Sequence, residues 1–507
     1  MDFKVINKAI AVPETLFDGF DERPVDCDFV LPDYYPDIAA VLKCTLRPVI
    51  QSKQLSGDRM LVDGVAVIHV LYLDEGRKCV RSCEFTKPFT STFTVRAGAG
   101  TPCAWVSAKS DYVNCRATSP RRLDIHGAFS VKLKMQEEGG NDVVSALTGD
   151  TVYTRKTVAS YSVPAVSAEK SFTLSEVLEL GQGKPAAEAL IRGEAVPVLS
   201  DCKMLPNKLI LKGELLMKNL YVSDLETGDT QQVRHEIPFS QIVDVDGLDE
   251  EWLSDVTLDV ASSDVHISAN QNGENRLLEV NIKLTAAVQC YRTGMAEVVT
   301  DAYSTRCPLR MDSKRVDTEC LKAVRRNDVT VKETLDLPGD DVTGIVDIWC
   351  EAVPVSEQCA DGKTQIMGRL MISMLAKDAA GVTSYYERPS DFTLEFDDDC
   401  DRISSDVRVM DVDYSMSGGQ IEIRAELSVT RRCYSVDSFQ AVCEIMADED
   451  AAFPPEKAAL KIYFANSGES LWEIAKACHT SMDAVMEENA LASDVLTQDA
   501  MLLVPLC

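Results

Sequence analysis

The sequence predicts a mainly β protein, in which three sandwich-like β-rich repeats precede a small α+β module with the order strand, helix, helix, strand. Three observations support this fold class. One strand pattern recurs three times at a spacing of about 150 residues, a charged segment with two prolines follows the third copy, and the apolar periodicity then changes from two residues to that of a helix. A chain of 507 residues with 45% apolar content can bury several such cores.

The recurring pattern begins with an apolar strand that contains a glycine near its start. The three copies are Gly64–Tyr72, Gly213–Tyr221 and Gly368–Ala376, and the last has alanine where the first two have tyrosine. Aliphatic and β-branched residues dominate these runs, so they are typical of buried strands. We interpret the two tyrosines as packing residues at the ends of those strands.

Each of these strands is followed by a polar turn and by a segment in which proline precedes an aromatic residue. These segments contain Pro88-Phe89, Pro238-Phe239 and Pro389 with Phe392. Because proline cannot donate a hydrogen bond to a sheet, we expect the segments at a sheet edge or in a turn. Turn chemistry then marks a hairpin in each copy, at Ser119-Pro120, Asn272-Gly273 and Ser417-Gly418-Gly419.

The segment after the third copy is predicted to be a linker, because it is charged, contains Pro454 and Pro455 and lacks periodicity. We therefore divide the chain into six parts. They are an N-terminal segment (1–28), a first repeat (29–165), a second repeat (166–315), a divergent third repeat (316–446), the linker (447–459) and a terminal module (460–507).

The terminal module combines two short strands with two helices. The first strand begins at Leu460, and the closing strand covers Met501–Pro505. Ser470 with Glu473, and Thr480 with Asp483, match the capping-box pattern that starts a helix. The second helix is expected to end near Asn489. The first helix carries its apolar residues at i, i+3, i+4 and i+7, so one face can form a minimal core.

This module resembles the LysM family, whose βααβ domains bind glycans containing N-acetylglucosamine. The resemblance rests on the run Ser467-Gly-Glu-Ser-Leu-Trp-Glu-Ile-Ala475, on Asn489 and Leu491, and on Leu502–Pro505. Two positions depart from the family pattern, since Glu469 replaces an aspartate and Asp499 lies where a glycine is usual. The resemblance implies a groove between the loop entering the first helix and the loop leaving the second.

That groove implies a set of binding residues contributed by the two loops. They are Ser467, Gly468, Glu469, Ser470, Leu471 and Trp472 on one side, and Asn489, Ala490 and Leu491 on the other. We interpret Trp472 as a residue of the core or of the groove wall rather than as a platform on which a sugar stacks. Recognition is favoured at Gly468–Leu471, where glycine permits a close turn and a helix start exposes N–H groups.

The upstream part of the chain is similar to the SPOCS repeat, also catalogued as a domain of unknown function, of bacterial endospore coat morphogenesis proteins. The similarity rests on Gly213–Tyr221 followed by residues 235–245, and on Leu31–Ile38. It implies a non-enzymatic scaffold that binds the ATPase of the coat's basement layer, stage IV sporulation protein A, through LysM and that has other coat proteins as further partners. It also implies a place in the mother-cell cytoplasm, at the forespore surface.

Charge and cysteine content narrow the choice of partners and compartment. The formal net charge of -30 repels phosphate backbones and anionic lipids, so nucleic acid is not an expected partner. The N-terminus lacks a signal-peptide pattern, and no apolar run is long enough to span a membrane. The 17 cysteines form no CxxC pair, which favours reduced thiols over a disulfide framework.

Motifs for catalysis, cofactors and metals are missing from the sequence. Gly181–Lys184 is followed by Pro185 and therefore lacks the hydroxyl of a phosphate-binding loop, and the five histidines lie in separate segments. The acidic run Asp397–Asp401 lacks the alternating ligands of a calcium loop, so we expect a solvated loop. The sequence predicts no enzyme, no metal site and no cofactor.

Three functions stay open from the sequence. The first is a spore-coat assembly adaptor, the second is a protein of the cell wall or spore cortex that binds peptidoglycan through LysM, and the third is an enzyme of unrecognised type. The sequence does not indicate which repeat binds which partner, the oligomeric state, or the role of residues 1–28.

Overall fold

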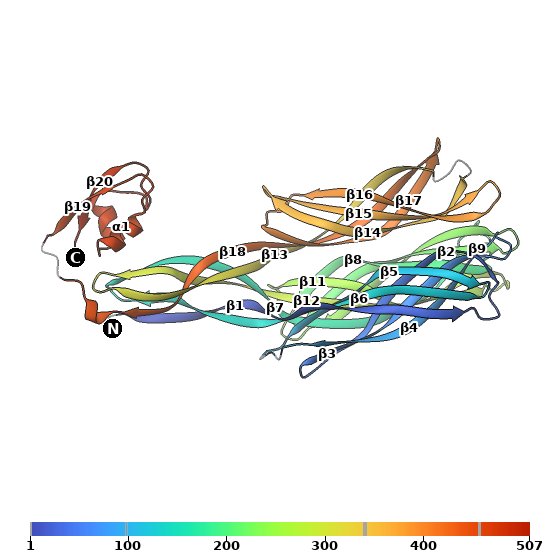
Figure 1. Ribbon diagram of the computed structural model, residues 1–507, viewed down its shortest axis with the longest axis horizontal. Helices are drawn as coiled ribbons and strands as arrows, with labels where there is room; N and C mark the ends of the chain where they lie inside the picture. The colour runs from blue at the N-terminus through green and yellow to red at the C-terminus, as the bar shows by residue number, and fades with distance from the viewer. Residues whose placement is uncertain (1–2, 97, 99, 338–341, 455–457, 507) are drawn as a thin grey trace.

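The computed structural model describes residues 3–96, 98, 100–337, 342–454 and 458–506, and within them it confirms the mainly β fold class. The first repeat consists of six strands that are connected in an up-and-down order (Figure 1). They are β1 (Lys4–Val30), β2 (Ile38–Ser56), β3 (Arg59–Asp74), β4 (Val80–Thr94), β5 (Cys103–Ser119) and β6 (Arg122–Thr148).

The second and third repeats reproduce the same six-strand order. The second contains β7 (Val152–Glu179), β8 (Ala189–Leu205), β9 (Lys208–Asp224), β10 (Asp229–Asp244), β11 (Leu253–Ala269) and β12 (Asn275–Ser304). The third contains β13 (Leu309–Asp336), β14 (Val342–Ala360), β15 (Lys363–Asp378), β16 (Thr383–Phe396), β17 (Arg402–Ser417) and β18 (Gln420–Ala447). The third repeat therefore keeps the topology although its sequence diverges.

Each repeat forms a sandwich of two three-stranded antiparallel sheets. In the first repeat the sheet β2-β3-β4 packs on the sheet β1-β6-β5, and the equivalent strands pair in the same order in the other two repeats. The hairpins predicted at Ser119-Pro120, Asn272-Gly273 and Ser417-Gly418-Gly419 are confirmed, since each lies between two paired strands. The glycine-containing strands β3, β9 and β15 occupy the centre of their sheets.

The recurring glycine and the recurring phenylalanine are cross-strand partners. Gly213 lies opposite Phe239, and a Cβ on Gly213 would lie 2.6 Å from the ring and closer still to the Val198 carbonyl oxygen. The pairs Gly64 with Phe89 and Gly368 with Phe392 repeat this arrangement. The aromatic ring thus covers a bare stretch of backbone, as in other sheets where an aromatic residue compensates for a glycine. The proline-aromatic segments lie on the edge strands β4, β10 and β16, as predicted.

The tyrosines that end two of the central strands are packing residues, as predicted. Tyr72 and Tyr221 are fully buried, and each hydroxyl donates to a carbonyl oxygen of the loop before the sandwich's second strand, that of Pro36 or Pro185. Arg276 donates to the carbonyl oxygens of Lys184 and Gly181 in the same loop. The glycine-rich segment Gly181–Lys184 therefore closes the second sandwich.

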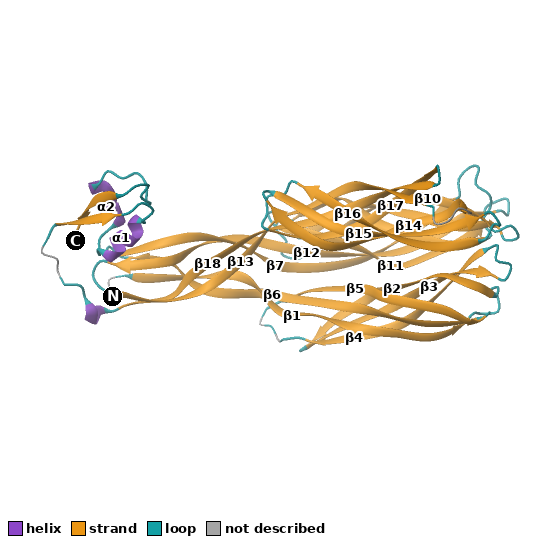
Figure 2. Ribbon diagram, turned by 45° about the horizontal axis from the view of Figure 1, so that its top comes forward, coloured by secondary structure: helices purple, strands orange, loops and turns teal. Residues whose placement is uncertain are grey.

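The first and last strands of each repeat continue beyond its sandwich as a two-stranded ribbon. The three ribbons are β1 with β6, β7 with β12 and β13 with β18, in strands of 27 to 30 residues. They run side by side away from the sandwiches and form a stalk (Figures 1 and 2). This stalk is not among the features that the sequence predicts. Residues 4–30, which include most of the predicted N-terminal segment, form a strand of the first ribbon.

The same two irregularities occur in all three ribbons. One residue is unpaired where each ribbon leaves its sandwich, at Leu16, Ala165 and Lys322, and another lies nearer the tip, at Ser145, Thr300 and Cys443. Such bulges bend a strand and increase its twist. Because their positions coincide in the three copies, residues of the ribbons can be matched one to one across the repeats.

The stalk has its own apolar core, to which every ribbon contributes matched residues. Near the tip Val144, Val299 and Val442 pack together and are fully buried. The next layer contains Val143, Val298 and Ala441 from one strand of each ribbon, with Ile10, Ala159 and Val316 from the other. No single ribbon could bury these side chains, so the three repeats fold against one another.

The sandwiches also meet through a small core and through buried polar contacts. Leu71, Ile191 and Trp349, one from each repeat, belong to a common apolar cluster. Burial at this junction, aided by the nearby charges of Arg192 and Arg47, lowers the pKa of His69 to about 4.

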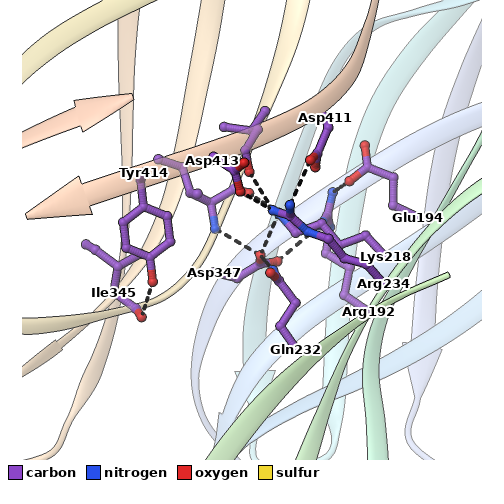
Figure 3. A network of polar contacts seen from close by, with 12 residues as sticks. Arg192, Glu194, Lys218, Gln232, Arg234, Ile345, Asp347, Asp411, Asp413 and Tyr414 are labelled. Carbon is purple, nitrogen blue, oxygen red and sulfur yellow. Dashed lines mark hydrogen bonds and ion pairs between the residues drawn. The ribbon is translucent and has the colours of Figure 1, made fainter. Parts of the chain in front are cut away.

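A buried carboxylate joins the second and third sandwiches (Figure 3). Asp347 of β14 has no exposed side-chain surface. It lies 3.1 Å from the Arg192 guanidinium and 3.4 Å from the Lys218 ammonium, and it accepts a 3.0 Å hydrogen bond from Gln232. All three of these partners lie in the second repeat. A buried charge of this kind requires such pairing, because an unpaired carboxylate in the interior is strongly destabilising.

The predicted domain limits stay predictions, since the ribbons of neighbouring repeats interlock. Ala447 ends β18, a 3-10 turn covers Glu449–Ala451, and the rest of the linker reaches the terminal module. Residues 1–2, 97, 99, 338–341, 455–457 and 507, which fall in several of the predicted parts, lie outside the described residues.

We expect Gly213→Ala to lower the free energy of unfolding of the second sandwich by about 2–3 kcal/mol, because the new methyl group would collide with backbone and with Phe239. Gly344→Ala is the matched control, since a Cβ there meets open space and the backbone is not left-handed. Urea unfolding of both variants measures the difference. Equal stabilities would contradict the assigned role of the glycine.

Candidate functional site

The terminal module is a βααβ unit, as predicted. It consists of β19 (Leu460–Ala465), α1 (Leu471–Ala477), α2 (Met482–Glu488) and β20 (Ala500–Pro505). Its core contains Leu471, Ile474, Val485, Leu502 and Val504. Since this core is separate from those of the stalk and the sandwiches, the module buries its apolar stripe on its own.

Neither predicted capping box forms. Ser470 precedes α1 but its side chain makes no capping hydrogen bond, because the loop backbone supplies the contacts there and Leu471 N–H donates to the Asp494 carbonyl. Ser481, not Thr480, caps α2, and its hydroxyl accepts a 2.9 Å hydrogen bond from Ala484 N–H. Thr480 is instead fully buried one residue earlier.

The first predicted binding loop is bonded to the loop that precedes β20. Ser467 N–H donates to Asp499 Oδ1, and Gly468 N–H donates to the Leu496 carbonyl, with Gly468 at a φ of +89° that favours glycine. Glu469 keeps Oε2 buried without a hydrogen-bond partner among the described residues, while Oε1 accepts from Asn466. Leu471 is fully buried in the module core and cannot contact a ligand.

The second loop holds the end of α2 against β20. The Asn489 side-chain amide donates to the carbonyls of Val485 and Leu503 and accepts from Leu503 N–H, all within 2.8 Å. This saturated side chain supports the fold rather than a ligand. Ala490 is exposed, and Leu491 packs partly against the core. The surface that the two loops offer therefore consists mainly of Ser467, Gly468 and Ala490, with Glu469 and Ser470 partly buried beside them.

The structure places Trp472 away from the loops, against the tip of the second ribbon. Its exposed fraction is 7%, its ring meets the Tyr303 ring edge-on, and its Nε1–H donates to Asp301 over 2.7 Å. The sequence alone could not indicate this contact, because Asp301 lies 171 residues away along the chain.

An exposed apolar surface on the module was missed by the sequence analysis. Ile462 and Phe464 of β19 and Met501 of β20 are 57%, 77% and 59% exposed. Phe464 lies directly opposite Met501 in the two-stranded sheet. The signal available in the sequence was the apolar residues at alternating positions of β19. A strand with one solvated face normally carries polar residues at the positions of that face.

The acidic run Asp397–Asp401 is solvated at Asp397, Asp399 and Asp401, as expected, but not at Asp398. Asp398 is buried and bonds Arg431 and Arg325 over 2.7 Å each and Thr364 over 2.8 Å. The two guanidinium groups compensate its charge, so it closes the end of the third sandwich.

Clusters that could bind a metal ion are not found in the described part of the chain. No group of three or more histidine, cysteine, aspartate or glutamate side chains there has the geometry to hold a metal ion. The sixteen cysteines that the structure describes are free thiols. None of the described helices is long and apolar enough to cross a membrane.

These features define a multi-module β scaffold that carries a small binding domain at one end. The comparison with protein families agrees with this class. The model of the SipL SPOCS domain matches residues 37–116 and 186–269, and the LysM domain model matches residues 465–505. The chain thus carries repeated SPOCS domains of the SipL type and a C-terminal LysM domain, and is related to sporulation.

The two SPOCS matches cover β2–β5 and β8–β11, which are the four shorter strands of the first and second sandwiches. The third sandwich has the same topology and lies outside both SPOCS matches. SPOCS and LysM are binding or structural domains rather than catalytic ones. No curated protein and no solved structure matches the chain.

We expect Asn489→Ala to destabilise the LysM domain by about 2 kcal/mol, because it leaves the Leu503 backbone groups without their partners. Native-state hydrogen exchange of β20 amides measures this loss. Gln498→Ala, an exposed position of the neighbouring loop, is the control. Unchanged β20 exchange in Asn489→Ala would contradict a structural role and return Asn489 to the candidate binding residues.

Proposed function

We propose that the chain is a non-enzymatic scaffold of bacterial endospore coat assembly. In this proposal LysM binds the ATPase of the coat's basement layer, stage IV sporulation protein A, and the scaffold localises coat proteins from the mother-cell cytoplasm to the forespore surface. The observation that carries it is the combination of SPOCS and LysM domains in one chain, which is typical of proteins of spore coat morphogenesis.

The arrangement of the modules supports such an adaptor. The stalk separates LysM from the three sandwiches, so the two ends of the molecule can engage different proteins (Figure 1). The exposed loop residues Ser467, Gly468 and Ala490 and the apolar surface of Ile462, Phe464 and Met501 leave LysM with accessible area for a protein partner. An exposed apolar surface of this kind commonly marks an interaction site.

The alternative function is binding of peptidoglycan or another N-acetylglucosamine glycan in the cell wall or spore cortex. The LysM match favours glycan binding in general. Two observations weigh against a preformed sugar platform in this chain. Trp472 lies against the stalk, and Leu471 lies in the core.

Co-purification of the full chain with the coat ATPase tests the proposal. We expect the intact chain to retain the ATPase and Ala490→Arg to retain at least tenfold less, because a long charged side chain would project from the exposed loop. Ala452→Arg makes the same change at an exposed position before LysM and serves as the matched control.

Retention of the full chain on purified murein separates the two functions. Strong binding to murein without binding to the ATPase would contradict the adaptor and support the glycan-binding alternative. Equal ATPase binding by Ala490→Arg and by Ala452→Arg would contradict the assignment of the groove loops to the partner.

A further inference from the structure

One face of the LysM domain is covered by the chain itself. Asp301 of β12 accepts hydrogen bonds from Trp472 Nε1 over 2.7 Å and from Lys476 Nζ over 2.7 and 2.8 Å. The Tyr303 hydroxyl donates to the Thr480 carbonyl over 2.9 Å, and Tyr153 stacks on the Tyr303 ring. An acid and two aromatic rings of the second ribbon thus face α1 and the start of α2.

The three ribbons differ at this position, although their backbones match. Counted from the bulge nearest the tip, Asp301 corresponds to Ala146 in the first ribbon and to Glu444 in the third. Two further sets of residues also correspond. Tyr303 corresponds to Thr148 and Met446, and its cross-strand partner Tyr153 to Lys4 and Arg310. Only the second ribbon combines a carboxylate with two tyrosines, so the LysM contact is specific to it.

The LysM domain does not need this contact to complete its fold. Its core of Leu471, Ile474, Val485, Leu502 and Val504 excludes Trp472, which packs in a separate cluster with Tyr303 and Ala475. Released from the stalk, the domain would present an indole and an ammonium group on one helix face. Tryptophan at the centre of an exposed patch is a frequent anchor of protein interfaces.

The connection between stalk and domain permits both states. About a dozen residues join β18 to β19, and in the docked state Phe453 stacks on His479 with ring centroids 3.6 Å apart. A short tether keeps the effective concentration of the stalk tip near the millimolar range. Few contacts can therefore hold the docked state, and a partner that binds the same face can shift the population.

We propose that the α1 face of LysM, with Trp472 and Lys476, is a protein-interaction surface that the stalk tip masks until a partner displaces it. The partner that fits presents a carboxylate next to an aromatic ring, as Asp301 and Tyr303 do. This inference rests on the proposed function, because it concerns how LysM reaches its protein partner. The groove loops and the apolar β19 surface stay accessible for the first encounter.

Oxidative footprinting of the full chain, read by mass spectrometry at Trp472, tests whether the stalk tip covers the α1 face when no partner is present. We expect Asp301→Ala to raise the labelling rate of Trp472 at least fivefold. Tyr303→Phe keeps the packed ring and loses only the hydroxyl contact, so a smaller rise is expected. Glu444→Ala, at the matched exposed position of the third ribbon, should leave Trp472 protected. Unchanged labelling in Asp301→Ala would overturn the mask.

Addition of the coat ATPase tests the displacement. We expect saturating ATPase to raise the labelling of Tyr303 and Tyr153 in the unmodified chain, and Asp301→Ala to bind the ATPase at least threefold more tightly than Glu444→Ala. Protected tyrosines at saturation, or weaker binding by Asp301→Ala, would show that docked LysM is the binding form and would overturn the proposal. A chain that does not bind the ATPase at all contradicts the proposed function, whereas the footprint of Asp301→Ala still reports on the mask.

Discussion

The packing of three ribbons into one stalk is the constraint on which the rest of the structure depends. Each ribbon has too little apolar surface to bury its own side chains. The layers formed by Val144, Val299 and Val442 close only when all three repeats are present. Two-stranded ribbons are marginal in water unless another surface covers them. The repeats therefore act as one body, and the LysM domain has a defined position at its tip.

Polar contacts between the sandwiches complement the apolar stalk. The chain carries a net charge of -30, yet buried carboxylates such as Asp347 and Asp398 lie against arginine or lysine side chains. Asp347 pairs with groups of the neighbouring repeat, and it therefore specifies which sandwich faces join. Buried pairs of this kind contribute specificity, although the desolvation of their charges is unfavourable. Removal of one partner would leave the charge of the other uncompensated.

Features that depend on local pattern could be predicted from the sequence. The glycine of each central strand, the proline-aromatic edge segment and the hairpin turns all follow from a few adjacent residues. The pairing of Gly213 with Phe239 was not predicted, since it joins two strands. The stalk could not be predicted this way, because the inward residues of one ribbon are defined by ribbons about 150 residues away. Trp472 illustrates the same limit, since its neighbours Asp301 and Tyr303 belong to another repeat. The capping boxes were wrong because loop backbone and tertiary burial, at Leu471 and Thr480, replaced the local side-chain contacts.

The proposed function depends on how the stalk connects the sandwiches to LysM. The stalk separates the sandwiches from LysM, and among the described residues of the three ribbons the second supplies the carboxylate and the tyrosine that bond LysM. Three repeats of one topology thus differ in their contacts with LysM through a few residues at their tips. In the proposed function the scaffold provides position, and the terminal domain provides recognition.

Native-state hydrogen exchange of the full chain tests the shared stalk most directly. The relevant amides lie in residues 4–15 and 136–148, 152–164 and 291–304, and 309–321 and 434–447. If the three ribbons form one core, their slowest amides exchange through the same unfolding event. They then share one free energy of opening and one dependence of that free energy on denaturant. Ribbons that open one after another, each with its own free energy, would contradict the central claim.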